Sequence, residues 1–331
     1  MIKLVTTEGS IVDRDQVIIE IIQAVQIKPA VIQIDLNGEG PCCQSNGIYD
    51  LLDNICGVFN YPKQQIEIHT ANFIERHHDY VIVKHHQNYE LKNAQKKYIT
   101  GVDSVKKFDQ DLRHFGHFIG HSNKERLYLA SYLRANHRSQ TLQSYHCDVS
   151  KSFHRSFIGI EDMMCDIGIP KENLIWAFDL ITHGPIKIDP IDVDYIGPDL
   201  TYNITDHYPG FFLELVSLTF NKGNTFYIDE KIWRPMLMRT PFMVQGPANL
   251  IVNLRQLGFQ TFDKWWDEGY SEDPDGCHVP AMIENIKQLS KLSLSELEIM
   301  YRDMTSVLDH NLHRLLELRK SDFNEIFSKV I

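Results

Sequence analysis

Four residues in one short segment have the types and the spacing to hold a diphosphate. Asp229 follows an apolar run and is able to cap a helix that begins with Glu230 and Lys231. The amino end of a helix offers free amide groups and a partial positive charge, which suits phosphate. Lys231 and Arg234 are three residues apart and share a helical face, so we expect them to neutralise two phosphates. Glu230 would then accept hydrogen bonds from ribose hydroxyls. The alternative is an ordinary solvated first turn of a helix that carries these charges without binding a ligand.

Pro235 lies directly after Arg234 and complicates this helix. Proline lacks the amide hydrogen that the interior of a helix uses for its ladder. We therefore expect the helix either to begin near Arg234 or to kink at Pro235.

A second segment, 115–133, places a small polar loop between an apolar run and a helix. The loop starts with a glycine, which lets a ligand approach the backbone closely. Ser122 or Asn123 is able to cap the helix, and Arg126 lies in its first turn. His121 lies in the loop and would reach a phosphate or a leaving group. An ordinary capped helix with a surface arginine and a structural loop histidine would show the same sequence.

The run Asp-Glu-Lys-Ile-Trp-Arg at 229–234, followed by Pro-Phe-Met-Val-Gln-Gly at 241–246, resembles the nucleotide-sugar motif of the fucosyltransferase and exostosin-like glycosyltransferases. The continuation at 254–262 is similar to phage and giant-virus relatives of that group. These enzymes have the GT-B architecture, in which two Rossmann domains face each other across a cleft. The resemblance is close over this stretch and loose over the remaining C-terminal half. The sequence departs from the fucosyltransferase form at Pro235 and in the turn at 238–240.

The resemblance implies roles for particular residues. It assigns Glu230 and Lys231 to the ribose and the diphosphate of the donor, and it places Arg126 and the loop with Asn123 at the donor phosphates. It also places Glu214, in the segment Glu-Leu-Val-Ser, at the border of the donor pocket. The residues alone predict a helix over 211–219, in which Glu214 is either paired or exposed, because burying an unpaired carboxylate is costly.

We expect the catalytic base in the N-terminal domain, from which the acceptor would enter such an enzyme. Ligands of open α/β sheets bind beyond the carboxyl ends of the strands, and polar groups follow three expected strands at 7–8, 37–39 and 70–72. Glu39 is our choice, because it lies between two glycines just before an expected helix. An inverting transfer needs a carboxylate or an imidazole near the acceptor hydroxyl. The alternative is a loop acid without a catalytic role.

We expect no metal and no other cofactor. Asp192 and Asp194 form an Asp-X-Asp triplet, but they lie in a proline-rich stretch instead of directly after a strand. The histidine pairs at 77–78 and 85–86 lack a partner carboxylate at helical or hairpin metal spacing. The six cysteines have the spacing of neither a zinc site nor a disulfide ladder, so we expect reduced core thiols.

The elements that must position these residues alternate between strands and helices, which predicts a mostly parallel sheet covered on both faces. Expected strands lie at 2–5, 31–36, 66–69, 80–83, 117–119, 142–146, 225–228 and 241–244. Expected helices lie at 16–25, from Pro41 through residue 52, and at 124–134, 158–167, 211–219, 248–257 and 294–318.

A polar stretch at about 84–110 divides this pattern into two parts. The expected fold is therefore α/β, with two Rossmann-like domains at 1–110 and 111–331. The N-terminal domain would lie on the acceptor side, and the C-terminal domain would bind the nucleotide sugar. We expect the terminal helix to pack back on the N-terminal domain.

The composition limits the partners of the chain. Its formal net charge of −11 disfavours a protein that binds mainly nucleic-acid phosphates. No apolar run approaches the roughly 20 residues that cross a bilayer, and the chain opens on a strand instead of a signal peptide. We therefore expect a cytoplasmic protein of a bacterium or of a virus-infected host cell, without a membrane span.

These features predict a glycosyltransferase that moves a sugar from a nucleotide-sugar donor to an acceptor hydroxyl. The acceptor would be a glycan or small molecule, or a hydroxymethylated base in viral DNA, and the second case would make the enzyme one of DNA modification. A non-catalytic sugar- or nucleotide-binding module of the same fold is the alternative. A Rossmann oxidoreductase is disfavoured, because no Gly-X-Gly-X-X-Gly follows any expected strand.

Overall fold

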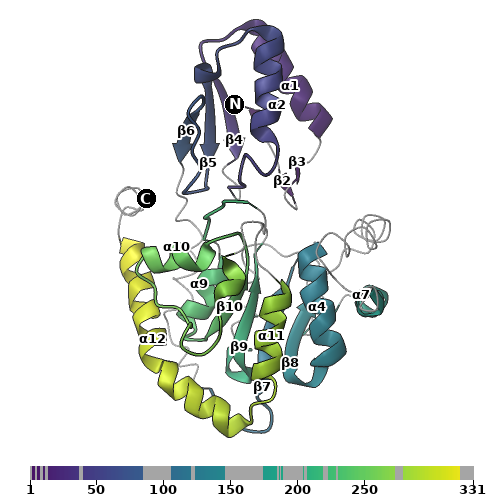
Figure 1. The fold of residues 1–331 in the computed structure, drawn as a ribbon, viewed down its shortest axis with the longest axis vertical. Helices are drawn as coiled ribbons and strands as arrows, with labels where there is room; N and C mark the ends of the chain where they lie inside the picture. The colour runs from purple at the N-terminus through teal and green to yellow at the C-terminus, as the bar shows by residue number, and fades with distance from the viewer. Residues whose placement is uncertain are drawn as a thin grey trace.

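Two separate β-sheets of four strands each organise the computed structural model, which confirms the expected α/β class (Figure 1). All the pairings within these two sheets are parallel. The structure describes residues 2–3, 6–7, 10–11, 14–36, 40–84, 106–120, 124–145, 174–184, 186, 188, 204, 207–218, 223–228, 230–272 and 279–320. No helix in these ranges combines the length and the apolar character needed to cross a membrane.

The first sheet is built from the N-terminal part of the chain. Its strand order is β1 (Ile2–Lys3), β4 (Ile32–Leu36), β5 (Ile66–Thr70) and β6 (Val81–Lys84). A short hairpin of β2 (Thr6–Thr7) and β3 (Ser10–Ile11) follows β1. The helices are α1 (Arg14–Ile27), which connects β1 to β4, and α2 (Ile48–Phe59), which connects β4 to β5.

Only one face of this sheet is apolar. Both helical crossovers run the same way along the sheet, so right-handed connections place α1 and α2 on one face, where they contact each other. On the other face Gln33 Nε2 donates to Glu67 Oε2 over 3.0 Å, and His69 Nε2 lies 3.3 Å from the same oxygen. Among the described residues no helix covers this polar face, so the expected covering of both faces is not observed there for this sheet.

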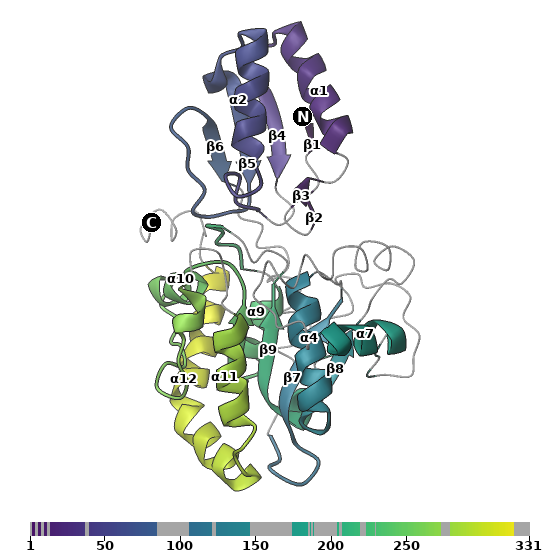
Figure 2. The same ribbon diagram turned by 45° about the vertical axis from the view of Figure 1, so that its right-hand side comes forward.

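The second sheet has the order β10 (Phe242–Gln245), β9 (Phe211–Ser217), β7 (Arg113–Ile119) and β8 (Thr141–Tyr145). Helix α4 (Lys124–Asn136) connects β7 to β8, and α9 (Glu230–Leu237) precedes β10. These crossovers run in opposite directions, so their helices lie on opposite faces. Helices α7 (Leu174–His183) and α11 (Val279–Leu289) contact α4, whereas α12 (Leu294–Lys320) contacts α9 (Figure 2). This sheet is therefore covered on both faces.

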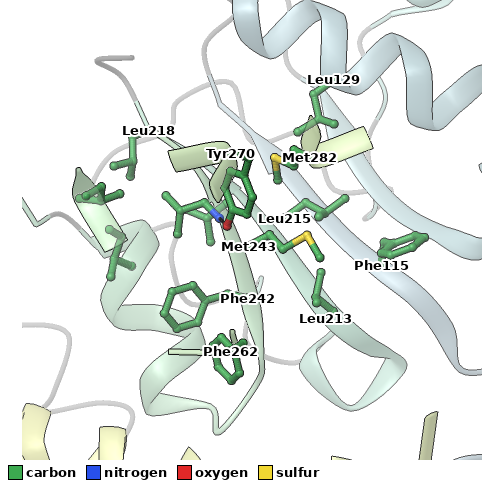
Figure 3. Packing of buried hydrophobic residues seen from close by; sticks show 14 of the residues in the cluster. Phe115, Leu129, Leu213, Leu215, Leu218, Phe242, Met243, Phe262, Tyr270 and Met282 are labelled. Atoms are coloured by element: carbon green, nitrogen blue, oxygen red, sulfur yellow. Dashed lines mark hydrogen bonds between the residues drawn. The ribbon is translucent and has the colours of Figure 1, made fainter. Parts of the chain in front are cut away.

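The core under α4 is a continuous apolar layer. Phe115, Leu213, Leu215 and Met243 come from neighbouring strands and lie on the same face of the sheet (Figure 3). Met282 of α11 packs in the same cluster. The inner strand β9 is buried at every position, as expected for a sheet with helices on both sides, and the edge strand β10 is buried at every position too.

Helix α12 begins with a reciprocal cap and packs within the C-terminal part of the chain. Ser293 N donates to Glu296 Oε2 over 2.8 Å, and Glu296 N donates to Ser293 Oγ over 3.3 Å, which is a capping box. Arg314 Nε donates to Leu257 O over 2.7 Å, and Asn311 bonds to both backbone groups of Gln260. Packing of the terminal helix on the N-terminal part stays a prediction, as does the domain boundary near residue 110.

Most expected elements agree with the structure to within a few residues, and the exceptions have physical causes. The expected helix at 211–219 is strand β9, because an inner strand buried on both faces shows no alternation that would distinguish it from a helix. Residues 225–228 form no strand, and the helix after Pro41 begins only at Ile48. Helices α7 and α11 were not expected. The expected helix at 158–167 lies outside the described residues.

Candidate functional site

The order of the C-terminal strands defines the edge at which a ligand would bind. The chain leaves β7 toward β8 on one side, and it leaves β9 toward β10 on the other side. Since β7 and β9 are neighbours, they form a topological switch point. Ligands of open α/β sheets bind outside the carboxyl ends of the strands at such a point. Helices α4 and α9 both begin at this edge. Each follows a strand that ends there and carries the chain back to the opposite edge, where the next parallel strand begins.

Arg126 connects helix α4 to the end of β9 at the switch point. It lies in the first turn of α4, and only 4% of it is exposed. Its Nε donates to Leu218 O over 3.2 Å, and its Nη2 donates to Ser217 O over 3.1 Å, at the carboxyl end of β9. Arg126 therefore ties the end of β9 to α4 and brings a permanent positive charge to this edge.

One polar side chain from each strand contributes to a row beneath α4. Gln143 Nε2 on β8 lies 3.4 Å from His117 Nδ1 on β7, and His117 Nε2 lies 3.2 Å from Ser217 Oγ on β9. Ser217 Oγ then donates to Gln245 Oε1 on β10 over 2.7 Å. Because Ser217 uses its single hydrogen on Gln245, we assign Nε2 as the donor of His117.

This row does not have the geometry of a serine nucleophile. A nucleophilic serine gives its proton to a histidine, whereas Ser217 gives its hydrogen to Gln245 and accepts from His117. Burial lowers the pKa of His117 to about 3, and the charge of Arg126 adds to this shift. The imidazole is therefore neutral at physiological pH. The row stiffens the carboxyl edge of the sheet instead of supplying a base.

Arg234 anchors α9 to β9. Its Nη2 forms an ion pair with Glu214 Oε1, its Nε donates to the Tyr208 hydroxyl over 2.7 Å, and Tyr208 donates to Glu214 Oε2. All three residues are buried. Burial alone would lower the pKa of Arg234, but the Glu214 carboxylate outweighs it and raises this pKa. Arg234 is therefore charged, and its charge is neutralised inside the protein.

The two cations of the motif differ in burial. The charge of Arg234 is buried and paired with Glu214 instead of facing a phosphate, whereas Lys231 is half-buried in the first turn of α9. The helix starts at Glu230 and continues past Pro235, which excludes a start near Arg234. The position of the Glu230 side chain lies outside the described part of the chain.

A second buried cation lies near the Glu214 pair. Lys106 Nζ donates to Tyr208 O over 2.8 Å and to Phe211 O over 2.5 Å. Burial lowers the pKa of Lys106 to about 7, against the opposing attraction of Glu214. Lys106 thus holds the start of β9 at the edge opposite the switch point.

The N-terminal part of the chain contacts the segment that leads to α9. Asn72, in the loop after β5, bonds to the backbone of Asn224 and Phe226. Phe73 N donates to Phe226 O over 3.0 Å. Asn72 lies in one of the three loops considered for the acceptor side, but its buried side chain is fully engaged in these contacts.

Several expected site residues lie outside the described part of the chain. Of the expected site residues the structure describes the side chains of Arg126, Glu214, Lys231 and Arg234, and among these four it pairs Glu214 with Arg234. The residues about which it shows nothing are Glu39, His121, Asn123, Asp192, Asp194 and the histidine pair at 85–86.

One group among the described residues has the donor atoms for a metal ion. His77, His78 and Asp79 place three such atoms within 4.8 Å of one another, so this histidine pair has a carboxylate beside it, although not at the helical or hairpin spacing that was considered. Asp79 Oδ2 also lies 3.3 Å from Lys63 Nζ, and Asp79 N donates to His77 Nδ1 over 3.1 Å. The ammonium group of Lys63 and the backbone N–H of Asp79 therefore already use part of this set of metal-binding atoms.

Cys42, Cys43 and Cys56 are free thiols in the core, as expected for reduced cysteines. Burial raises the pKa of Cys43, and the negative charge of Glu75 adds to it. A thiol of this kind is a poor nucleophile, because the thiolate is the reactive form. Cys43 therefore has a structural role.

Sequence reasoning missed the residues whose roles depend on remote partners. His117 and Ser217 carry a usable signal, because each is a polar residue near the carboxyl end of a buried strand. Tyr208 and Lys106 carry no local signal, since their partners on β9 and α9 are recognised only after the sheet has formed.

No protein-family model, no curated protein and no solved structure matches this chain. The features that bear on its function are therefore the arrangement at the switch point and the motif at 229–234.

Proposed function

We propose that this protein is a nucleotide-sugar-dependent glycosyltransferase whose C-terminal sheet binds the donor at its carboxyl edge. The observation that carries the proposal is the position of two helix amino ends at the switch point, each with a basic residue in its first turn. Arg126 lies in the first turn of α4, and Lys231 lies in the first turn of α9. Helix amino ends and fixed cations together favour a diphosphate.

Each residue has a chemical task in this proposal. Lys231 contacts the diphosphate, and the buried charge of Arg126 adds to the positive potential at the edge. The ion pair of Arg234 with Glu214 keeps α9 in place, so Arg234 acts as a positioning residue. Glu230 binds the ribose hydroxyls.

The transfer itself requires a nucleophile and a base. The acceptor oxygen attacks the anomeric carbon, the bond from that carbon to the diphosphate oxygen breaks, and the acceptor proton passes to a base, for which Glu39 is our candidate. The acceptor is the hydroxyl of a glycan or small molecule, or of a hydroxymethylated DNA base. The net charge of −11 disfavours the DNA acceptor.

Thermal unfolding in the presence of nucleotides tests the donor site. The panel contains uridine, guanosine, adenosine and thymidine diphosphates and the corresponding nucleotide sugars. We expect the nucleotides of one base to raise the melting temperature most. A ligand at 100 times its Kd stabilises a fold by about 2.7 kcal/mol, which such an experiment detects. A panel in which no nucleotide raises the melting temperature would overturn the proposal.

Release of the nucleoside diphosphate separates an enzyme from a binding module of the same fold. We expect slow release from the preferred nucleotide sugar in water and faster release when a suitable acceptor is added. Tight binding of the donor without release under either condition would indicate the non-catalytic module.

A further inference from the structure

Asn72 connects the N-terminal part of the chain to the segment 224–228, which lies directly before α9. It is completely buried and follows β5 by two residues. Its partners Asn224 and Phe226 are more than 150 residues away along the sequence. A fully buried amide with partners on such a distant segment specifies a single arrangement of the two segments.

All four hydrogen-bonding positions of the Asn72 amide are used. Oδ1 accepts from Phe226 N over 2.9 Å and from Ile74 N over 3.3 Å. Nδ2 donates to Asn224 O over 3.1 Å and to Glu75 Oε2 over 3.1 Å. An asparagine side chain offers two acceptor and two donor positions, so it has none left for a ligand.

Glu75 fixes the orientation of this amide. Its Oε2 also accepts from Cys43 N over 3.0 Å, and its Oε1 accepts from the Tyr49 hydroxyl over 2.6 Å. Because a carboxylate only accepts, the NH2 group of Asn72 must face Glu75, and Oδ1 must face Phe226 N. Glu75 therefore prevents the amide from turning over.

Phe73 completes the connection. Its backbone N–H donates to Phe226 O over 3.0 Å, and the two rings are 5.8 Å apart in an edge-to-face arrangement. The Phe73 side chain packs in the C-terminal apolar cluster, although the residue follows the N-terminal strand β5. Both backbone groups of Phe226 are thus bonded to the loop after β5.

The loop after β4 closes against the same point. Gly40 has a φ of +58°, and a Cβ atom added there would lie 2.3 Å from Asn72 N. Only glycine permits this close approach. The loop after β4 therefore packs directly against Asn72, which itself lies in the loop after β5.

We propose that Asn72 is a positioning residue, through which the N-terminal part of the protein holds the segment 224–228 and so places the amino end of α9 for the donor. This inference rests on the proposed function, because it assigns Lys231 to the donor diphosphate. Asn72 itself contacts neither donor nor acceptor. It acts through the backbone of Asn224 and Phe226, which precede Lys231 on the same segment.

The test is the substitution Asn72→Asp in the full chain. The new side chain has the same shape, but it loses both donors and places a second carboxylate beside Glu75. We expect faster hydrogen–deuterium exchange in the peptide 223–237. We also expect about tenfold weaker binding of the nucleoside diphosphate that stabilises the wild type most in the panel of four bases.

Asn311→Asp is the matched control. Asn311 is 1% exposed, accepts from Gln260 N over 2.8 Å and donates to Gln260 O over 2.8 Å, so it also holds a remote backbone segment. Its substitution should raise exchange near residues 257–262 and leave the affinity for the nucleoside diphosphate unchanged. Asn72→Ala, which adds no charge, replaces Asn72→Asp if the aspartate variant does not fold.

Each outcome decides the inference. Unchanged exchange in 223–237 overturns it. So does faster exchange with an unaltered affinity, because Asn72 would then hold the segment without serving the donor. If the wild type binds none of the four diphosphates, the proposed function fails and the assignment to the donor fails with it, whereas the exchange experiment still decides whether Asn72 holds α9.

Discussion

Two basic residues of one motif occupy different environments in this protein. Arg234 is buried against Glu214 and Tyr208, whereas Lys231, three residues earlier, is half-buried in the first turn of α9. A planar guanidinium with several donors suits a buried carboxylate and a phenol at once. Arg234 therefore fixes the helix, and in the proposed function Lys231 contacts the ligand.

Lys231→Ala should weaken binding of the preferred nucleoside diphosphate by roughly 10- to 100-fold. The substitution removes a charge-assisted contact of about 1.5 to 3 kcal/mol. Titration calorimetry measures the change, with Lys287→Ala as the control, because Lys287 is an exposed lysine paired with Glu284 on α11. An unaltered affinity in the Lys231 variant would remove this residue from the site.

Glu214→Gln should destabilise the fold by about 3 to 5 kcal/mol, because it leaves the buried Arg234 guanidinium without a counter-charge. Urea denaturation measures the loss. The exposed pair of Lys264 and Asp303 offers the comparison, since Asp303→Asn should change stability little. Equal effects of the two substitutions would contradict the assignment of Arg234 as the anchor of α9.

Lys106 should make stability depend on pH. Burial lowers its pKa from the ordinary 10.5 to about 7, so between these values the unfolded chain binds a proton that the folded protein does not. The stability of the wild type therefore rises with pH in this window. Relative to Lys106→Met, the wild type should gain roughly 1 to 3 kcal/mol between pH 6 and pH 9, as measured by urea denaturation at each pH. A difference between the two proteins that does not vary with pH would show that Lys106 keeps its ordinary pKa.

At the scale of elements, α12 holds the turn that follows α10 (Leu250–Gln256). Its residues His310 and Arg314 bond to the carbonyl oxygens of Gly258 and Leu257. Gly258 has a φ of +87°, which side chains rarely adopt, and an added Cβ atom would lie 2.9 Å from Arg314 Nε. The position of α12 therefore depends on the backbone freedom of one glycine.

Gly258→Ala should destabilise the protein by about 1 to 3 kcal/mol, through strain at a positive φ. Gly57→Ala is the matched substitution. Gly57 lies inside α2, and an added Cβ atom there meets nothing within 4 Å, so alanine should stabilise by roughly 0.5 to 1 kcal/mol. Thermal unfolding of both variants should show shifts of opposite sign. A Gly258 variant as stable as the wild type would mean that the turn adopts another conformation.

At the scale of the whole molecule, the proposed donor site offsets phosphate charge with protein groups. Helix amino ends and basic residues meet at the switch point, and we therefore expect transfer to continue in excess EDTA. Asp192→Ala and Asp194→Ala should each leave turnover within about threefold, a barrier change of roughly 0.7 kcal/mol. Loss of activity on chelation with recovery in manganese would move the donor site to the segment around Asp192.

The sequence alone was sufficient for features that depend on near neighbours along the chain. The alternation of strands and helices predicted the α/β class, and the apolar period predicted α12 over 294–318 against the observed Leu294–Lys320. The first turns of α4 and α9, with Arg126 and Lys231, were located in the same way. Such features are encoded within a few helical turns, so no tertiary contact is needed to predict them.

Only the tertiary structure decided the features that depend on remote partners. Strand β9 was expected as a helix, because an element buried on both faces has no polar side that marks its period. Residues 225–228 were expected as a strand, but Asn72 and Phe73 bond to Phe226 and take the place of a neighbouring strand. The partner of Glu214 was unknown until the fold brought Arg234 to it. Burial and pairing depend on which segments meet in space, and local sequence does not specify that meeting.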